Sequence, residues 1–281
     1  MTQVMNAEFA FSAQDFERVR KLIHSRAGIS LADSKETLVY GRLSRRIRKL
    51  GMRSFVQYLD SLDASPSSPE WVEFTNALTT NLTAFFREAH HFETLAELMR
   101  AQPAGKIRLW SAACSTGEEA YSLAITACEV FDSLTPPVEI IATDLDTQVL
   151  TKAASGIYDI ERVAGLSQER KKLFFHKGSG PQAGKCRVKA PLQRLIRFEP
   201  LNLLAPKWPV RGEFLAIFCR NVMIYFDKDT QYQILSRLVR HLPPQGLLFA
   251  GHSESFFHAA DVVTSCGKTV YRPTAHVKEA S

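Results

Sequence analysis

A stretch of small residues that ends in two acids is the first part of the sequence suited to chemistry. Residues 111–119 read Ser-Ala-Ala-Cys-Ser-Thr-Gly-Glu-Glu and separate a short apolar segment from a helical pattern beginning at Glu118. Neither G-x-G-x-x-G nor G-x-x-x-x-G-K-[ST] occurs here, so the loop lacks the glycine patterns that hold nucleotide phosphates. Glu118 and Glu119 would repel a pyrophosphate at a helix start, although acids there also simply stabilise a helix. The loop therefore favours a neutral or cationic ligand group.

A second acidic feature, Thr-Asp-Leu-Asp at residues 143–146, follows the next apolar segment. In open parallel sheets, ligands bind beyond the carboxyl ends of the strands, and an acid after the second strand accepts hydrogen bonds from ribose hydroxyls. Asp144 fits this role, with Asp146 as the competing candidate. A ribose acceptor next to a loop that disfavours phosphate indicates S-adenosyl-L-methionine. Its ammonium group can meet the carboxylates, and its carboxylate can meet Arg87 or backbone amides.

The positive charge of the chain is concentrated in one segment. The chain has 35 basic and 29 acidic residues, a formal net charge of +6 at pH 7. Residues 35–53 hold seven lysines and arginines and the single acid Glu36, so their net charge equals that of the whole chain. Four of these cations are spaced so that one helix face can carry them: Arg42, Arg45, Arg46 and Lys49. Such a face is either simply solvated or suited to an acidic partner; no aromatic residues alternate with the charges, so nucleic acid is not expected.

Two periodicities divide the chain into parts. Up to residue 80 the apolar residues recur at helical spacing, which predicts an all-α domain with helices near residues 16–27, 34–49, 55–62 and 70–80. Residues 81–105 are expected to form a linker and a connecting helix. From residue 106 to 281, strand and helix patterns alternate, which predicts an α/β domain whose parallel sheet is covered on both faces.

The expected strands of this sheet are residues 107–110, 138–142, 214–219, 247–250 and 269–272. Residues 174–198 interrupt the alternation with three glycines and two strand-like segments, 186–189 and 195–198. These segments predict a small antiparallel β-subdomain inserted in the α/β domain.

Composition excludes several classes of protein. The 281 residues are 45% hydrophobic and 23% charged, as in globular domains. No apolar run approaches the roughly 20 residues that cross a bilayer, and no secretory signal pattern opens the chain. Five scattered cysteines fit a reducing, cytoplasmic environment and argue against structural zinc. Only His90 and His91 among eight histidines are adjacent, and helix neighbours point to different faces, so no metal site is expected.

Four segments resemble those of one protein family. They are Asn-Leu-Thr-Ala-Phe-Phe-Arg-Glu-Ala-His-His at 81–91, Trp-Ser-Ala-Ala-Cys-Ser-Thr-Gly-Glu-Glu at 110–119, Ala-Thr-Asp-Leu-Asp at 142–146 and Cys-Arg-Asn-Val-Met-Ile-Tyr-Phe at 219–226. In this order, and over about residues 10–272, the sequence is similar to the CheR family of chemotaxis receptor glutamate O-methyltransferases. The resemblance implies a Rossmann-like methyltransferase domain with a small antiparallel β-subdomain, preceded by an all-α domain. It also implies S-adenosyl-L-methionine as cofactor, S-adenosyl-L-homocysteine as product and no metal.

The resemblance assigns roles to individual residues. Those implied to contact the cofactor are Asn81, Thr83, Arg87, Glu119, Asp144, Asn202, Leu203, Arg220 and Asn221. Arg87 and Tyr225 are implied to be catalytic, Arg87 by orienting the incoming carboxylate or the cofactor and Tyr225 by lying beside the transferred methyl group. The spacing to Asp144 favours Glu119 over Glu118, and that choice stays open. Each assignment also has an ordinary structural alternative, such as an ion-paired Arg87 or a Tyr225 that fills a sheet.

The implied reaction needs no catalytic base. A glutamate side chain has an ordinary pKa near 4.3, so at neutral pH it is already a nucleophilic carboxylate. Its attack on a sulfonium methyl group neutralises two charges, and a dry site that positions both reactants favours this step.

The resemblance also supplies partners. These are the methylation helices of methyl-accepting chemotaxis receptors, whose glutamates would bind to the cations of the basic helix face. In the insert, Gly178 and Arg187 would bind a receptor's C-terminal peptide added as a strand, with Arg187 taking its carboxylate. A tight turn at 178–181 and a short edge at 186–189 are expected to serve this purpose. The enzyme is expected to act as a monomer, without nucleic acid and without insertion into a membrane.

Three alternatives compete with this interpretation. A nicotinamide-dependent oxidoreductase needs a glycine-rich first loop, and Gly117 stands alone here. Nucleic-acid and amine methyltransferases often carry Asp/Asn-Pro-Pro-aromatic, whereas both Pro-Pro pairs of this chain precede other residues. A catalytically inactive scaffold that binds S-adenosylmethionine as a signal is the third, and Arg87 and Tyr225 count against it.

Overall fold

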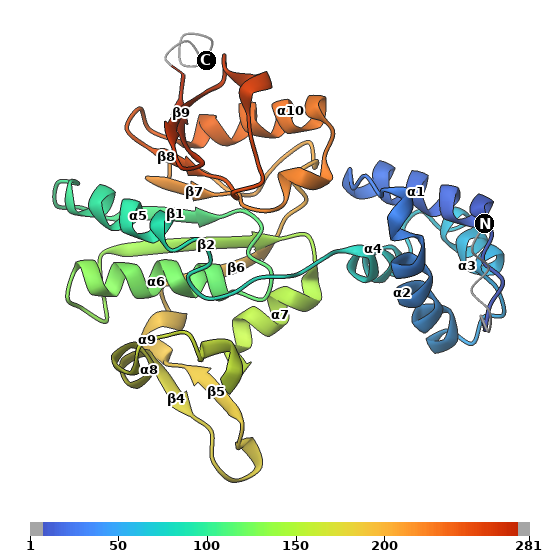
Figure 1. The fold of residues 1–281 in the computed structure, drawn as a ribbon, viewed down its shortest axis with the longest axis horizontal. Coiled ribbons are helices and arrows are strands. Elements are labelled where there is room, and N and C mark those ends of the chain that lie inside the picture. The colour runs from blue at the N-terminus through green and yellow to red at the C-terminus, as the bar shows by residue number, and fades with distance from the viewer. Residues whose placement is uncertain (1–7, 275–281) are drawn as a thin grey trace. The chain divides into compact units, whose positions relative to one another are not determined.

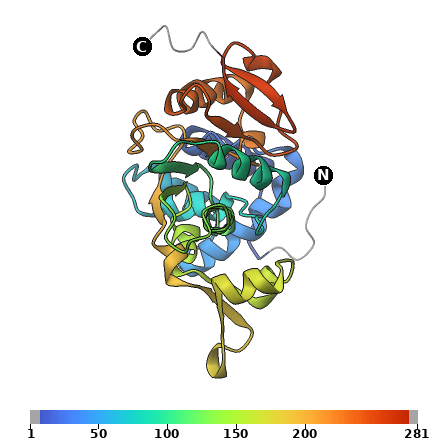
Figure 2. The same cartoon turned by 90° about the vertical axis from the view of Figure 1, so that its left-hand side faces the viewer.

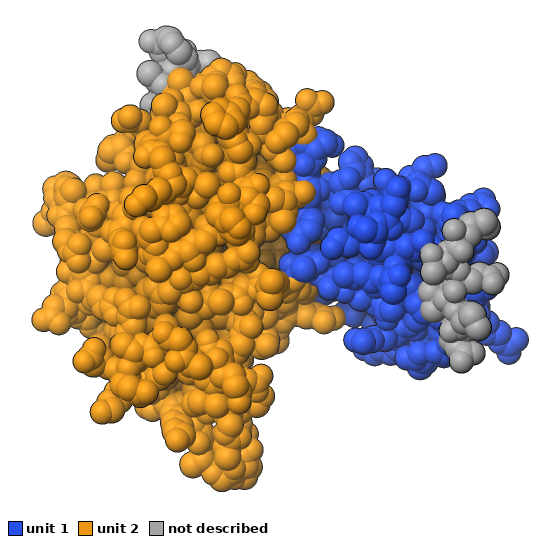
Figure 3. Space-filling model, viewed as in Figure 1, with its two compact units in different colours: residues 1–80, 225–227 blue, residues 81–224, 228–281 orange. Residues whose placement is uncertain are grey.

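A computed structural model, which describes residues 8–274, divides the chain into two compact units (Figure 1; Figure 3). The helical unit comprises the chain up to residue 80 together with residues 225–227. The α/β unit comprises residues 81–224 and the chain from residue 228 onwards. No helix within residues 8–274 is both long and apolar enough to span a membrane.

The helical unit forms where the sequence predicts helices. Its helices are α1 (Ala13–Ala27), α2 (Glu36–Lys49), α3 (Phe55–Asp63) and α4 (Glu70–Leu78). A capping box starts α1: the Ser12 side chain accepts a hydrogen bond from the Asp15 amide, and the Asp15 carboxylate accepts one from the Ser12 amide. Gly28, with φ 67°, ends α1 in the left-handed conformation that only glycine adopts at little cost.

The α/β unit is built on a seven-stranded sheet in the order β6-β2-β1-β7-β8-β10-β9. Its strands are β1 (Ile107–Ser111), β2 (Val138–Asp144), β6 (Ile196–Pro200), β7 (Ala216–Phe218), β8 (Leu247–Phe249), β9 (Val263–Gly267) and β10 (Val270–Pro273). The first five in the spatial order run parallel, whereas β10 pairs antiparallel with both β8 and β9. The prediction of a wholly parallel sheet is therefore wrong at this edge. A tight turn at residues 268 and 269 reverses the chain there, which leaves no room for the helix that a parallel crossover needs.

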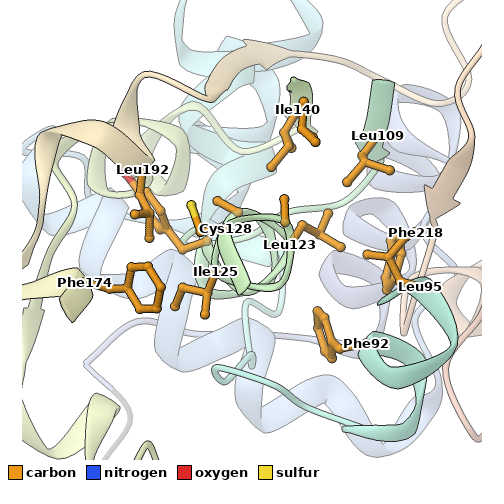
Figure 4. Close-up of a cluster of buried hydrophobic side chains, with 14 of the residues drawn as sticks. Phe92, Leu95, Leu109, Leu123, Ile125, Cys128, Ile140, Phe174, Leu192 and Phe218 are labelled. Carbon is orange, nitrogen blue, oxygen red and sulfur yellow. The ribbon is translucent and has the colours of Figure 1, made fainter. Parts of the chain in front are cut away.

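Both faces of this sheet are covered, as predicted. Leu109 belongs to the cluster around α6 (Glu118–Val130), which Figure 4 shows with Leu123, Ile125 and Cys128 of that helix. Trp110, one residue along β1, faces the other way and packs against the rings of Trp208, Phe214 and His241.

The remaining helices of the α/β unit are α5 (His90–Arg100), α7 (Thr147–Ser155), α8 (Gln168–Phe174), α9 (Ala190–Gln193) and α10 (Lys228–Leu238). α5 packs against α6, and α7 packs against β2 and β6. Phe92 of α5 also stacks on Phe218 of β7, so α5 is anchored on the sheet close to the strand end that carries Arg220.

A separate three-stranded antiparallel sheet, in the order β3-β5-β4, forms the predicted β-subdomain. Its strands are β3 (Ile157–Asp159), β4 (Phe175–Lys177) and β5 (Lys185–Val188), and the β4–β5 hairpin projects away from the main sheet (Figure 1; Figure 2). Two expectations are wrong. Residues 196–198 belong to β6 of the main sheet, paired with β2, and β5 is the central strand of the small sheet rather than an edge. The edges are β3, which lies outside the predicted insert, and β4.

Candidate functional site

The loop after β1 turns sharply into α6 at Gly117. Gly117 has φ 94°, and a Cβ atom there would lie 2.7 Å from the Ala153 Cβ and 3.0 Å from the Tyr158 hydroxyl oxygen. Ser115 also adopts a positive φ of 49°. The loop is therefore compact, and its conformation depends on the one glycine that the sequence offers.

Glu119, in the first turn of α6, is anchored at both carboxylate oxygens. Oε1 accepts a hydrogen bond from the Ser111 hydroxyl at 2.6 Å, and Oε2 accepts one from Arg220 Nη1 at 3.0 Å. The side chain is 10% exposed, and that of Arg220 is 2% exposed. Glu119 thus joins the ends of β1 and β7 and keeps a small accessible surface.

Glu118 has a different set of partners and is fully buried. It accepts a hydrogen bond from the Thr116 hydroxyl at 2.6 Å and forms an ion pair with Arg162. Arg162 also donates to the Thr83 carbonyl at 2.8 Å. Because the Glu118 carboxylate has no exposed surface, its geometry supports Glu119 as the acid for a ligand.

The two acids after β2 have different surroundings. Asp146 caps α7 by accepting hydrogen bonds from the Gln148 and Val149 amides, and it is buried. Asp144 is half-buried and accepts hydrogen bonds from the Ser115 amide at 2.8 Å and the Asp146 amide at 2.9 Å.

Burial raises the pKa of Asp144 to about 6, and the hydrogen bonds from the Asp146 and Ser115 amides oppose part of that rise. The Leu145 amide is a third donor, and because a carboxylate has about four acceptor positions, Asp144 can still accept from a further hydroxyl. This carboxylate at the end of β2 fits a hydroxyl of a ribose.

The segment that precedes α5 crosses these strand ends. Asn81 donates from Nδ2 to Asp146 Oδ2 at 2.8 Å, and its carbonyl accepts from the Ser115 hydroxyl at 3.0 Å. Thr83 is tied to Arg162 through its carbonyl, as described above. Asn81 and Thr83 therefore lie beside the loop after β1 and the acids after β2.

Arg87 is presented by a strained backbone. Its two neighbours, Phe86 and Glu88, have φ of 51° and 57°, in the left-handed region that non-glycine residues rarely adopt. The Arg87 side chain is partly exposed and donates to the Leu82 carbonyl at 3.0 Å, within its own segment. Strain of this kind is typical of residues that a site must place with precision.

Arg220, directly after Cys219, ties three segments together rather than facing solvent. Besides Glu119, its guanidinium lies 3.4 Å from Glu88 Oε2 and donates to the Arg87 carbonyl. Asn221 follows with φ 58°, and its amide donates to Glu254 Oε2 at 2.9 Å. The Arg-Asn pair is thus part of the framework at the end of β7.

The predicted adenine segment lies next to β2. The Leu201 amide donates to the Asp144 carbonyl at 2.8 Å and extends the β6–β2 pairing by one residue. Asn202 Oδ1 accepts from the Leu204 amide at 2.9 Å, while Leu203 is buried. The fold therefore brings Asn81, Thr83, Glu119, Asp144, Asn202, Leu203, Arg220 and Asn221 to the carboxyl ends of β1, β2, β6 and β7.

Tyr225 belongs to the helical unit by its contacts, and its carbonyl accepts a hydrogen bond from the Ser30 amide at 2.9 Å. Its catalytic role stays a prediction.

The four predicted docking residues of α2 have different surroundings within the helical unit. Arg46 forms ion pairs with Glu70 and, at 3.0 Å, with Glu73, and its side chain is only 15% exposed. Arg42 donates to the Thr79 and Ala77 carbonyls at the end of α4, and burial lowers its pKa. Arg45 and Lys49 are exposed. The helix face is thus shared between structural and accessible cations.

Gly178 and Arg187, the predicted peptide-binding residues, both lie in the small sheet. The Gly178 amide donates to the Lys185 carbonyl at 2.9 Å, and a Cβ atom at this glycine would lie 2.1 Å from the Gln182 carbonyl oxygen. Arg187 is exposed on the central strand β5, opposite Ile157 of β3 and His176 of β4.

Sequence reasoning missed several residues that stabilise this framework through hydrogen bonds and ion pairs. Glu254, which is 4% exposed, accepts hydrogen bonds from the Asn221, Met223 and Gly251 amides. Its position soon after β8, among the strand ends, was the available signal. Arg162 and Glu88 had no such signal, because their partners Glu118 and Arg220 are remote in sequence.

Comparisons with known proteins concern the sequence of the whole chain. Residues 14–79 match the family described as "CheR methyltransferase, all-alpha domain", and residues 81–272 match "CheR methyltransferase, SAM binding domain". Chemotaxis protein methyltransferase 2 of Pseudomonas aeruginosa is 53% identical over 270 residues, which cover 95% of this chain and 96% of that protein. Chemotaxis protein methyltransferase of Escherichia coli is 50% identical over 267 residues, with 95% and 93% covered.

A solved structure of a TehB-like SAM-dependent methyltransferase from Corynebacterium glutamicum is 14% identical, has a TM-score of 0.37, and covers 66% of this chain and 96% of that one. The family matches span both units, and the relatives match nearly end to end. The chain therefore belongs to the CheR family of chemotaxis protein methyltransferases.

Proposed function

We propose that this chain transfers the methyl group of S-adenosyl-L-methionine to glutamate carboxylates of chemotaxis receptors, with the strand ends of the α/β unit as cofactor site. The observation that carries the assignment of the site is the partly exposed Asp144 carboxylate, held by the Ser115 and Asp146 amides beside a loop without phosphate-binding glycines. Asp144 accepts a hydrogen bond from a ribose hydroxyl, and Glu119 faces the amino-acid end of the cofactor. Asn202 and Leu203 line its adenine side.

Bound S-adenosylmethionine supplies an electrophilic methyl group on a sulfonium. The protein's part is to place a glutamate carboxylate in line with that methyl group and to exclude water, which otherwise stabilises the separated charges. Arg87 suits the positioning role because a guanidinium binds a carboxylate through two parallel hydrogen bonds. The bent backbone at Phe86 and Glu88 supports this assignment, since it fixes the direction from which Arg87 leaves the chain. Tyr225 is the second candidate beside the methyl group.

Transfer of labelled methyl groups tests the proposal. The chain is incubated with methyl-labelled cofactor and the cytoplasmic fragment of a receptor, and mild base should then release the label as methanol from a glutamyl ester. A receptor whose methylation-site glutamates are replaced by alanine is the matched control. Binding of S-adenosylhomocysteine without any base-labile label would instead support the inactive scaffold.

For receptor docking, we propose that Arg45 and Lys49 of α2 attract the acidic methylation helices. Both are exposed, whereas Arg46 is engaged by Glu70 and Glu73 and Arg42 by the end of α4. The docking assignment of Arg46 and Arg42 is therefore reduced to a supporting role, in which they hold α2 against α4.

For tethering, we propose that a receptor's C-terminal peptide adds as a strand to the β4 edge of the small sheet. Gly178 directly follows β4 and permits the close turn into the following residues, while Arg187 on the adjacent strand offers an exposed cation for the terminal carboxylate. Calorimetric titration with the peptide and with its C-terminally amidated form tests this. Equal binding of both forms by the wild type would contradict the role of Arg187, and no binding of either would contradict tethering.

A further inference from the structure

A cluster of three potential metal ligands lies where α5 begins. Glu88, His90 and His91 each offer a ligand atom, and these atoms all lie within 4.8 Å of one another. Sequence reasoning set His90 and His91 aside because neighbours on a helix diverge. They occupy the first turn of α5, after the bent segment at Glu88, and their ring centroids are only 4.2 Å apart.

Two buried atoms in this cluster face one another without a hydrogen bond. His91 Nδ1 and Glu88 Oε2 are both buried, neither has a hydrogen-bond partner among the described residues, and they lie 3.6 Å apart. The His91 side chain has no exposed surface and that of Glu88 is 10% exposed. A buried imidazole nitrogen that lies opposite a carboxylate oxygen is an arrangement that a bound cation would satisfy.

Nε2 of each ring lies near a backbone carbonyl. His91 Nε2 lies 3.1 Å from both the Lys268 carbonyl oxygen and the Thr269 hydroxyl oxygen, and His90 Nε2 lies 3.3 Å from the same Lys268 carbonyl. With the proton on Nε2 of His91, Nδ1 of that ring is the acceptor that faces Glu88. Histidines that bind metals are oriented in this way, by donating their second N–H to a carbonyl.

We propose that Glu88, His90 and His91 form a binding site for Zn²⁺. Two imidazole nitrogens and one carboxylate are a set that zinc prefers, and a distance of 3.6 Å between two ligand atoms suits bonds of about 2.0–2.2 Å to one ion. His252 Nδ1, which lies 3.2 Å from Glu88 Oε1, offers a fourth nitrogen from the loop after β8. Arg220, 3.4 Å from Glu88 Oε2, opposes the cation, so binding is weaker than at a closed structural site.

This site is coupled to the proposed cofactor site through Glu88 and Arg220. A metal ion that draws Glu88 away removes one of the two ion-pair partners of Arg220, whose other partner is Glu119. Zinc should therefore weaken the binding of S-adenosylhomocysteine, and the cofactor product should weaken zinc by the same factor. This coupling rests on the proposed function of Glu119, whereas metal binding itself does not.

The test is titration of the untagged full chain with Zn²⁺ by calorimetry and with Co²⁺ by visible absorption, first without cofactor. We expect one ion per chain, and at least about a 100-fold loss of Zn²⁺ affinity in His90→Gln, because removing a ligand exceeds the 10–100-fold cost of removing an outer-shell partner. Thr269→Val, which keeps all three ligands, should lose about tenfold. His258→Gln, an exposed histidine outside the cluster, is the matched control and should bind as the wild type does.

His91→Gln is a second variant. Because His91 is fully buried, this variant can fail to fold, and His90→Gln then decides the test. Absence of stoichiometric binding, or equal binding by His90→Gln and His258→Gln, would overturn the site. Stoichiometric binding that leaves the affinity for S-adenosylhomocysteine unchanged would overturn the coupling. Failure of the wild type to bind S-adenosylhomocysteine, with metal binding intact, would count against the proposed function instead.

Discussion

The α/β unit and the helical unit use the same arginine–glutamate pairing at very different depths. Arg220 and Glu119 are 2% and 10% exposed, and their pair connects the strand ends at which the cofactor is proposed to bind. Arg48 and Glu8 of the helical unit are 58% and 49% exposed. Arg46 and Glu70, at 15% and 14%, lie between these extremes. Burial makes an unpaired charge costly, so the deep pairs constrain the fold strongly and the exposed ones remain available to partners.

The largest effect is expected from breaking the deepest of these pairs. Glu119→Ala leaves the Arg220 guanidinium buried with one partner fewer and should lower the free energy of unfolding by about 3–5 kcal/mol. Urea denaturation of the cofactor-free chain measures this. Arg48→Ala, which removes an exposed pair, should leave the denaturation midpoint unchanged. Equal shifts for both variants would show that depth does not separate the two regions.

Arg87 lies in the α/β unit but, unlike Arg220, it is partly exposed and pairs only within its own segment in the described structure. Arg87→Ala should therefore reduce kcat about 100-fold by misplacing the carboxylate, while hardly changing stability. Arg87→Lys should restore only part of the rate, because lysine lacks the planar fork. Methyl transfer at saturating cofactor and receptor is the measurement. Near-normal turnover of the alanine variant would remove Arg87 from the mechanism.

The pH dependence of cofactor binding tests the burial of Asp144. Its pKa is about 6, and only the ionised carboxylate keeps an acceptor free for the ribose, so affinity for S-adenosylhomocysteine should fall about tenfold per pH unit below 6. Folding raises this pKa, so the ionised carboxylate opposes folding of the free chain. The protonated carboxyl group contributes to stability at low pH, and this contribution is lost as the pH rises through 6. Asp144→Asn should bind weakly at every pH and lack this dependence. The same pH profile in Asp144→Asn would assign it to another group.

The smallest effects separate two neighbours on α2. Arg46→Ala should lower the free energy of unfolding by about 1–2 kcal/mol, because Glu70 and Glu73 lose the ion pair that each forms with Arg46, and should leave the salt dependence of receptor methylation unchanged. Arg45→Ala should do the reverse, raising the receptor KM by about two- to threefold at low salt without a change in stability. Initial rates at several salt concentrations decide between them. A larger salt effect from Arg46 than from Arg45 would reverse the assignment.

Much of the fold was predictable because the signals were local. The helices α1 to α4 begin and end close to the ranges that the spacing of apolar residues predicts, and the strands β1, β2, β7 and β8 are apolar runs of strand length. β6 was misassigned to the insert because its pairing with β2 is decided by a partner distant in sequence. The same reason explains why β5 was taken for an edge.

The sequence by itself determined the family, the order of the two domains and the strand ends at which the acids lie, because these depend on short motifs and on periodicity. Only the tertiary structure decided which acid is free to bind. Glu118 forms an ion pair with Arg162, and Asp146 caps the start of α7. Asp144 is partly exposed and keeps an accessible acceptor position. It also decided that His90 and His91 converge with Glu88. The cap formed by Asp146 is local, but the other partners come from segments far apart in the chain, and no local pattern encodes them.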